Sequence, residues 1–187
     1  MRPSKRDELL QKALKIFYRN GFHATGMDML ASETGISKTS MYKYFRTKED
    51  LILAVLRLRD ENFRNWFVRQ VEDRASNPRD QLIAMFDVLS DWFDDPNFRS
   101  CMFIKASSEY QEIDDSIYAQ SAEHKRLMFV YSRDVAAKAG AKEPDALAHQ
   151  LMLLKEGAIV TAHMGYSENP AADAKSAALQ LINQAID

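Results

Sequence analysis

The sequence predicts an all-α protein of about nine helices. Through most of the chain, apolar residues recur at helical spacing, and the alternation typical of β-strands is nearly absent. Glycine and proline are scarce, with 6 and 5 residues in 187, and they stand at the breaks between the periodic segments. Several segments begin with a helix-capping sequence, which assigns their starts.

Four helices are expected in the N-terminal part of the chain. Capping boxes open the first, second and fourth of them, at Ser4-Lys-Arg-Asp7, Thr25-Gly-Met-Asp28 and Thr47-Lys-Glu-Asp50. Gly21 follows the first helix, in the position where glycine commonly ends one. The expected spans are Ser4 to about Asn20, Thr25 to about Thr34, about Lys38 to Phe45, and Thr47 to about Arg74.

Five further helices are expected after residue 76. Asn77-Pro78, Glu143-Pro144 and Asn169-Pro170 mark three of the starts, because proline suits the first helical position. Gly140 and Gly165 mark two of the ends. The expected spans are Asn77 to about Asp94, about Phe98 to Tyr110, about Ser116 to Ala139, Glu143 to about Gly165, and Asn169 to the C-terminus.

The composition is that of a globular protein, with 46% hydrophobic and 28% charged residues. The longest uninterrupted apolar run, Leu51 to Leu56, is far shorter than the roughly 20 residues that span a bilayer. The cationic N-terminus leads into no apolar segment, so no signal peptide is expected. The single cysteine fits a reducing compartment. These features predict a cytoplasmic protein with no membrane partner.

Charge is distributed unevenly along the chain. Residues 1–48 contain 10 Lys and Arg against 4 Asp and Glu, a net charge of +6, and the remainder contains 15 against 23, a net charge of −8. The two sums give the overall net charge of −2. A basic segment on an acidic body indicates a local anion-binding face, although short segments also vary in charge without functional meaning.

The second and third expected helices are short and are joined by the segment 34–37. Gly35 can take the positive φ that a tight turn between helices requires. Ala31 is small enough to let the helices approach, and Leu30 and Met41 can wedge between them and the first helix. This is the geometry of a helix-turn-helix, whose second helix enters the major groove of DNA. An unrelated pair of helices could share the spacing.

The outward face of the third expected helix favours the DNA-binding interpretation. It is rich in side chains that donate hydrogen bonds to phosphates and base edges. These residues are Ser37, Lys38, Thr39, Ser40, Tyr42 and Lys43.

The segment from Ser4 to about Leu56, centred on "GFHATGMDMLASETGISKTSMYKYFRTKEDLILAVL", resembles the N-terminal domain of the TetR family of bacterial transcription regulators. The most specific part is "GISKTSMYKYFRTKEDL". The resemblance implies a helix-turn-helix DNA-binding domain at 1–47 and a helical effector-binding and dimerisation domain at 48–187. It also implies a ligand-responsive regulator, expected to be a repressor, which binds double-stranded operator DNA as a homodimer and is released by a small apolar effector.

The resemblance also implies roles for single residues. Thr25, at the expected N-cap, would hold a phosphate, Tyr42 and Lys48 would contact other phosphates, and the residues at 38–40 would reach bases. Tyr44 would contact phosphate or pack under the turn, and Lys43 would be a contact or a solvated charge. The expected DNA-binding residues are Thr25, Ser37, Lys38, Thr39, Ser40, Tyr42, Lys43, Tyr44 and Lys48.

The middle of the chain is rich in methionine and aromatic residues at helical spacing. Such residues usually form plain core, but they also line small-molecule pockets between helices, and the family places its effector there. The expected effector pocket consists of Phe63, Trp66, Met85, Phe86, Trp92, Cys101, Met102, Met128, Tyr131 and Met152.

The eighth expected helix is apolar on more than one side, unlike a helix that meets solvent along one whole face. The ninth carries small residues that permit close approach of another helix. They could form half of a four-helix dimer interface or an intramolecular core. The expected interface residues are Leu147, Leu151, Leu154, Ala158, Ala174, Ala178, Leu181 and Ile182.

No catalytic signature stands out. The sequence has no phosphate-binding glycine loop, no His-Glu-x-x-His and no Cys-x-x-Cys motif. His149, Glu156 and His163 share a helical stripe but span too many turns to bind one metal ion. We therefore expect no enzyme, cofactor or metal. The alternative is an all-α small-molecule-binding protein, or a helical enzyme, that does not bind DNA.

Overall fold

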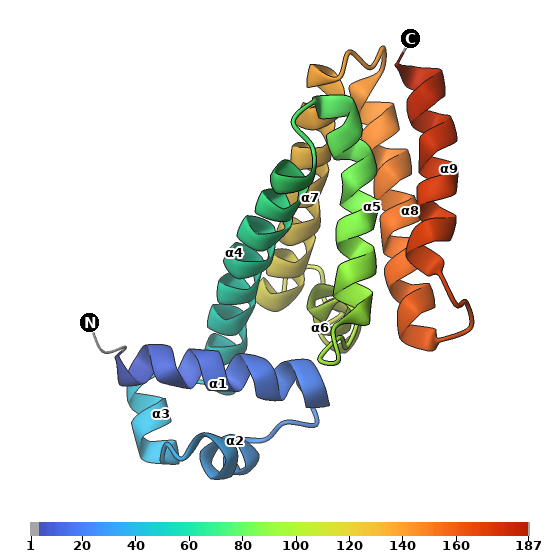
Figure 1. Cartoon of the computed structure of the whole chain (residues 1–187). Coiled ribbons are helices and arrows are strands. Elements are labelled where there is room, and N and C mark those ends of the chain that lie inside the picture. The colour runs from blue at the N-terminus through green and yellow to red at the C-terminus, as the bar shows by residue number, and fades with distance from the viewer. Residues whose placement is uncertain (1–3, 187) are drawn as a thin grey trace. The chain divides into compact units, whose positions relative to one another are not determined.

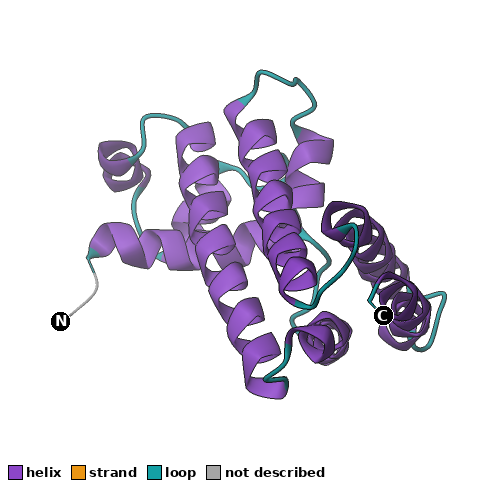
Figure 2. Cartoon of the chain, turned by 90° about the horizontal axis from the view of Figure 1, so that it is seen from above, coloured by secondary structure: helices purple, strands orange, loops and turns teal. Residues whose placement is uncertain are grey.

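A computed structural model describes residues 4–186, and in this part of the chain all regular secondary structure is helical (Figure 2). The expected all-α fold is confirmed. The helices are α1 Lys5–Asn20, α2 Met27–Thr34, α3 Lys38–Tyr44, α4 Lys48–Arg74, α5 Pro78–Asp94, α6 Met102–Glu109, α7 Ser116–Lys138, α8 Pro144–Met164 and α9 Pro170–Ala185. Within residues 4–186, none of these helices combines the length and apolarity that crossing a bilayer demands.

Three of the predicted helix starts are confirmed at the level of single hydrogen bonds. Ser4 forms a reciprocal capping box with Asp7. Thr47 and Asp50 do the same at the start of α4, with N–H to side-chain oxygen distances of 3.1 and 3.0 Å. The Asn77 side chain accepts a hydrogen bond from the N–H of Asp80 at 2.9 Å. These caps satisfy N–H groups that a helix leaves without partners in its first turn.

Two of the predicted starts were wrong. Gly26, not Thr25, is the N-cap of α2, and no side chain caps this helix. The Thr25 hydroxyl instead donates to the carbonyl of Gly21 at 2.7 Å. Helix α6 begins at Met102 rather than near Phe98, because Ser100 has a φ of 69°, which interrupts a right-handed helix.

Contacts divide the chain into two compact units. Within the described residues, unit 1 consists of 4–62 and 102–124, and unit 2 consists of 63–101 and 125–186. Helix α4 therefore contributes its first part to unit 1 and its last part to unit 2, and α7 is shared in the same way. Each unit is described separately below.

In unit 1, α2 and α3 pack against α1 (Figure 1). The buried face of α1 presents Leu9, Ala13 and Phe17, which repeat at helical spacing. Leu30 of α2 and Met41 of α3 are fully buried, as the predicted wedge between the three helices requires. In unit 2, α9 packs along α5 and α8, and the three helices lie side by side in Figure 1.

Candidate nucleic-acid interface

The turn between α2 and α3 has the geometry that its glycine predicts. Gly35 is left-handed, with a φ of 71°, and its N–H donates to the carbonyl of Ala31 at 3.1 Å. A Cβ on Gly35 would meet no atom within 4 Å, so the glycine is required by the backbone conformation and not by close packing. The ammonium of Lys12 donates to the carbonyl of Thr34 at 2.8 Å and so ties α1 to the end of α2.

Helix α3 is fixed at its start by a serine cap. The Ser37 hydroxyl accepts from the N–H of Ser40 at 3.2 Å. Met41 is fully buried, which confirms its expected place in the core, and Phe45 is nearly fully buried. The opposite face is open to solvent: Lys38, Thr39 and Lys43 are exposed, Ser40 is half-buried, and Tyr42 and Tyr44 are 49% and 40% exposed. The short helix thus presents hydroxyl and ammonium groups from a buried anchor.

Lys38 forms an ion pair that was not expected. Its ammonium lies 2.8 Å from a carboxylate oxygen of Asp28 on α2, and this hydrogen bond raises the pKa of Lys38. Both side chains are exposed. No local pattern predicts the pair, because the two residues are ten positions apart and meet only when the turn brings α2 and α3 together.

Thr25 and Lys48 lie at two helix starts. Thr25 is fully buried, with its hydroxyl bonded to Gly21, so the segment before α2 can offer backbone N–H groups more readily than the Thr25 side chain. Lys48 is half-buried in the first turn of α4, beside Glu49 and Asp50. Acidic residues suit a helix start, whereas a lysine there opposes the helix dipole.

Two further cations of unit 1 are held by tertiary contacts. The guanidinium of Arg6 lies 5.1 Å from the ring centre of Phe45, so α1 also contacts the end of α3. Arg19 of α1 pairs with Glu33 of α2 at 2.5 Å. Both pairs brace the helices that carry the exposed donors.

The family model described as bacterial regulatory proteins, tetR family, matches residues 9–55, which span most of α1, all of α2 and α3, and the start of α4. This match covers the helix-turn-helix and its buried anchors. Residues 9–55 are therefore a TetR-family DNA-binding domain. The TetR family comprises DNA-binding regulators with the helix-turn-helix and not enzymes.

Two curated relatives and one solved structure illustrate the similarity to other TetR proteins. The chain is 34% identical over 93 residues to the transcriptional activator FasR of Mycolicibacterium smegmatis, an alignment that covers 50% of this chain and 42% of FasR. It is 36% identical over 86 residues to the transcriptional repressor KstR2 of the same species, covering 44% of this chain and 40% of KstR2. The chain thus spans less than half the length of both relatives.

The solved structure is that of SCO4454, a TetR-family transcriptional regulator from Streptomyces coelicolor. It superposes with a TM-score of 0.90 at 24% identity, and the alignment covers 97% of this chain and 96% of SCO4454. The shared fold therefore extends over both units, beyond the part that the family profile matches.

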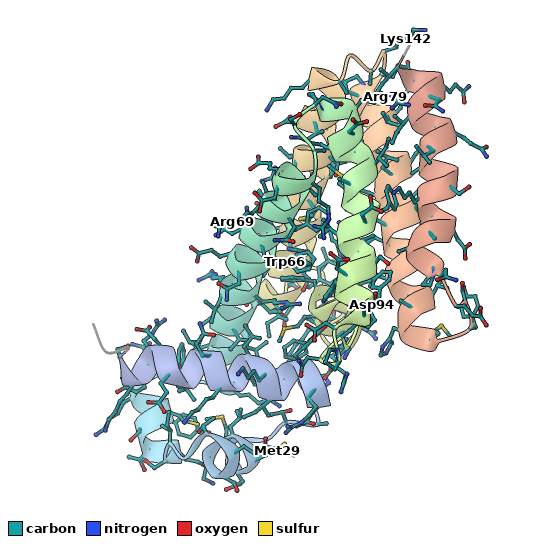
Figure 3. The ribbon with its side chains drawn as sticks, in the orientation of Figure 1. Met29, Trp66, Arg69, Arg79, Asp94 and Lys142 are labelled. Atoms are coloured by element: carbon teal, nitrogen blue, oxygen red, sulfur yellow. The ribbon has the colours of Figure 1, made fainter. Side chains whose placement is uncertain are left out.

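Four of the ten residues expected to line an effector pocket, Phe63, Trp66, Trp92 and Tyr131, belong to an aromatic core in unit 2. Phe63 lies 4.9 Å from Trp92 and 5.5 Å from Trp66, measured between ring centres, and Trp66, labelled in Figure 3, is partly exposed. Phe67 was not among the expected lining residues, but its ring contacts the rings of both Phe63 and Tyr131. Met85, Phe86, Cys101 and Met128 are buried, Met152 is half-buried, and Met102 is buried within unit 1.

Polar groups lie beside this aromatic core. The hydroxyl of Tyr131 is buried without a hydrogen-bond partner, and burial raises the pKa of Tyr131 to about 12. Lys155 is buried, with its ammonium 5.6 Å from the ring centre of Phe67, and burial lowers its pKa to about 8. Helical periodicity could not reveal Lys155, because one cation inside an apolar stripe usually reaches solvent.

A half-buried lysine, Lys125, lies near the single cysteine. The ammonium of Lys125 is 3.3 Å from Sγ of Cys101 and 2.5 Å from a carboxylate oxygen of Glu156. Burial opposes the charge of Lys125, but Cys101 and Glu156 outweigh it and raise the pKa of this lysine. Within residues 4–186, no three His, Cys, Asp or Glu side chains are grouped to hold a metal ion.

The residues expected at a dimer interface lie mostly inside the protomer. Leu147, Leu151, Ala158, Ala174, Ala178 and Ile182 are buried, and Leu154 and Leu181 are half-buried. The exposed apolar residues of α8 are different ones. Leu153 is 74% exposed and Met164 is 69% exposed, and Val160 lies between them at helical spacing. Two grooves run between α8 and α9, one at each end, and small residues contribute to both.

Proposed function

We propose that the protein is a ligand-responsive transcriptional repressor that binds operator DNA in the cytoplasm as a homodimer. The exposed face of α3 carries this proposal. Its donors, Lys38, Thr39, Ser40 and Tyr42, stand on a helix anchored by buried Met41 and capped by Ser37. Phosphate contacts by Lys48, by Tyr42 and by the backbone N–H groups at the start of α2 supply affinity, and contacts from the start of α3 read the bases.

The dimer follows from the size of this face. A single short helix reaches only a few base pairs, so two copies related by a two-fold axis are needed for a site of useful length. The exposed side of α8 supports a partner surface, because Leu153, Val160 and Met164 form an apolar stripe and Gly157 lies within it. We propose that this stripe and the half-buried Leu154 and Leu181, rather than the buried residues alone, form the centre of the interface.

We propose that the effector binds in unit 2 among the aromatic residues around Phe63, Trp92 and Tyr131. The lining is mostly apolar, which favours an apolar small molecule. The buried hydroxyl of Tyr131 and the ammonium of Lys155 could each receive a polar group of such a molecule. An effector that binds the DNA-free form more tightly must lower DNA affinity, and DNA must lower effector affinity by the same factor.

The names of the two relatives do not agree on the direction of regulation, since one is an activator and the other a repressor. A transcription assay with the selected operator placed over or upstream of a promoter decides between them. Repression is the expected outcome, and stimulated transcription would contradict it.

The test of DNA binding starts from a random pool of duplex DNA. Repeated binding to the wild-type protein should enrich a site with two similar halves, whose centres lie about one helical turn, or a multiple of it, apart. Enrichment of no sequence, together with no retardation of random duplex at low salt, would contradict the proposed function and leave a small-molecule-binding protein.

A further inference from the structure

Within unit 1, one carboxylate of α6 holds the turn that follows α1. Glu109 accepts hydrogen bonds from the N–H of Phe22, at 2.9 Å to Oε1 and 3.1 Å to Oε2, and from the N–H of His23 through Oε2. Two consecutive peptide N–H groups thus converge on one anion. Hydrogen bonds to an ionised acceptor are roughly twice as strong as those between neutral groups, so this is a firm attachment.

The carboxylate also lies directly against the backbone of the turn. Gly21, which ends α1, has a φ of 84°, and a Cβ at this position would lie 3.0 Å from Oε1 of Glu109. A side chain at Gly21 would therefore be strained by its backbone conformation and would press on the carboxylate.

A second contact of opposite charge joins the same two segments. The ammonium of Lys105, one turn before Glu109 on α6, donates to the carbonyl of Tyr18 at 3.3 Å. Tyr18 lies in the last turn of α1, where carbonyls lack partners within the helix and attract cations. The ring of Tyr110 adds an apolar contact, with its centre 4.7 Å from that of His23 and 6.5 Å from that of Phe22.

The turn that Glu109 holds leads directly into α2. The N–H of Thr25 donates to the carbonyl of Phe22 at 3.3 Å, and the Thr25 hydroxyl donates to the carbonyl of Gly21 at 2.7 Å. Gly26 then caps α2. Two hydrogen-bond steps therefore connect the carboxylate on α6 with the start of α2, where the proposed function places a phosphate contact.

We propose that Glu109 is a positioning residue for DNA binding: it fixes the turn at Phe22 and His23, and through Thr25 it aims the N-terminus of α2 at a phosphate. This inference rests on the proposed function. Under this inference, Glu109 helps to set the geometry of a DNA-binding surface whose residues lie near position 25, far away in the sequence.

The test compares Glu109→Gln with Glu112→Gln. Glutamine keeps the shape of Glu109, but its amide group would face one of the two N–H donors and lose that hydrogen bond. Glu112 is exposed in the loop just after α6, and its substitution removes the same charge. Affinity is measured on the duplex selected by the wild-type protein, and circular dichroism confirms that each variant is folded at the temperature of the measurement.

The two substitutions should have different effects on DNA affinity. Removing a negative charge weakens repulsion from DNA, so Glu112→Gln should leave affinity unchanged or raise it slightly. Glu109→Gln should lower affinity about tenfold, the change expected when a charge-assisted hydrogen bond is lost. A merely structural Glu109 would lower the melting temperature and leave the affinity of the folded protein at the wild-type value.

Amide hydrogen exchange supplies a second measurement. In Glu109→Gln, the amides of Phe22 and His23 should exchange faster, and those in the middle of α1 should keep their protection. Unchanged exchange at both amides, or wild-type affinity in folded Glu109→Gln, would overturn the inference while wild-type DNA binding still supported the proposed function. Failure of the wild-type protein to bind any duplex would overturn both.

Discussion

At the residue scale, Lys48 is a cation whose position local helix stability does not explain. It lies in the first turn of α4, where the helix dipole disfavours a positive charge. Lys48→Ala should therefore weaken binding to all DNA sequences and reduce the slope of log affinity against log salt by about one unit, because one phosphate contact is lost.

Lys138→Ala is the matched control for this prediction. Lys138 is exposed in the last turn of α7, in unit 2, and its substitution removes the same charge. Titrations at several salt concentrations should give the wild-type slope for Lys138→Ala. An unchanged slope in Lys48→Ala would remove this residue from the interface.

Lys155 makes stability depend on pH. Burial lowers the pKa of Lys155 to about 8, from 10.5 in an exposed lysine, so the unfolded chain binds the proton more tightly than the folded one. The free energy of unfolding should then rise with pH between about 8 and 10.5, and below pH 8 the penalty of burying the charge is fully present. The shift corresponds to at most about 3 kcal/mol.

Lys155→Met should remove this penalty. Methionine has a similar shape and no charge to desolvate, so the variant should melt at a higher temperature than the wild type at pH 7, and the difference should shrink as the pH approaches 10.5. Urea unfolding at pH 7 and at pH 10 measures both values. A difference that grows with pH would contradict the cause assigned to the lowered pKa.

At the scale of elements, Gly35 tests whether the turn between α2 and α3 serves DNA binding. Its φ of 71° is costly for any other residue, and a Cβ there has open space, so Gly35→Ala should cost about 1 kcal/mol of stability through the backbone alone. Relief of that strain would move α3 and weaken DNA binding.

Gly140→Ala makes the control for the turn. Gly140 also has a positive φ, of 84°, and a Cβ there also has open space, but it follows α7 in unit 2. Thermal unfolding should show a similar loss of stability in both variants, and a gel shift should show weaker binding only in Gly35→Ala. Equal binding by the two variants would separate the turn from DNA recognition.

The sequence predicted the elements better than their contacts. Caps at Ser4, Thr47 and Asn77 depend on residues three positions apart, so local rules were sufficient for them. The start of α6 was missed because Ser100 takes a positive φ, for which serine carries no strong signal. The exposed face of α3 followed from periodicity around Met41, because a short helix with one anchor has only one buried side.

Contacts between distant segments could not be predicted. The pair of Lys38 and Asp28 requires the turn at Gly35, and the attachment of Glu109 to Phe22 joins residues 87 positions apart. Charged side chains at such separations have many possible partners, and only the packed fold selects one. The burial of Thr25 was missed for the same reason: the local pattern predicted Thr25 as the cap, but Gly26 occupies that position and no side chain caps α2.

At the scale of the whole molecule, the exposed stripe of α8 should mediate self-association. Leu153→Asp places a charge at a position that is 74% exposed in the protomer, so it should not disturb folding, but it would bury an unpaired charge in a dimer. Sedimentation at micromolar concentration should show a wild-type dimer and a Leu153→Asp monomer that binds the selected duplex much more weakly.

Ile113→Asp is the control, because Ile113 is 81% exposed in a loop of unit 1 and its substitution introduces the same charge. It should remain dimeric. A dimer that survived Leu153→Asp would place the interface on another surface.

The ion pair between Lys38 and Asp28 has a consequence for how the protein meets DNA. The Asp28 carboxylate holds the ammonium of Lys38 as a phosphate oxygen would, so the free protein carries its own counter-ligand on the face proposed to read DNA. A duplex can contact Lys38 only after it displaces that carboxylate, which costs free energy. On a wrong sequence, the new contacts of Lys38 do not fully offset this cost. The Asp28 carboxylate would thus compete with phosphate for Lys38. This competition would shorten the residence time of the protein on wrong sequences and still permit binding to well-matched sites.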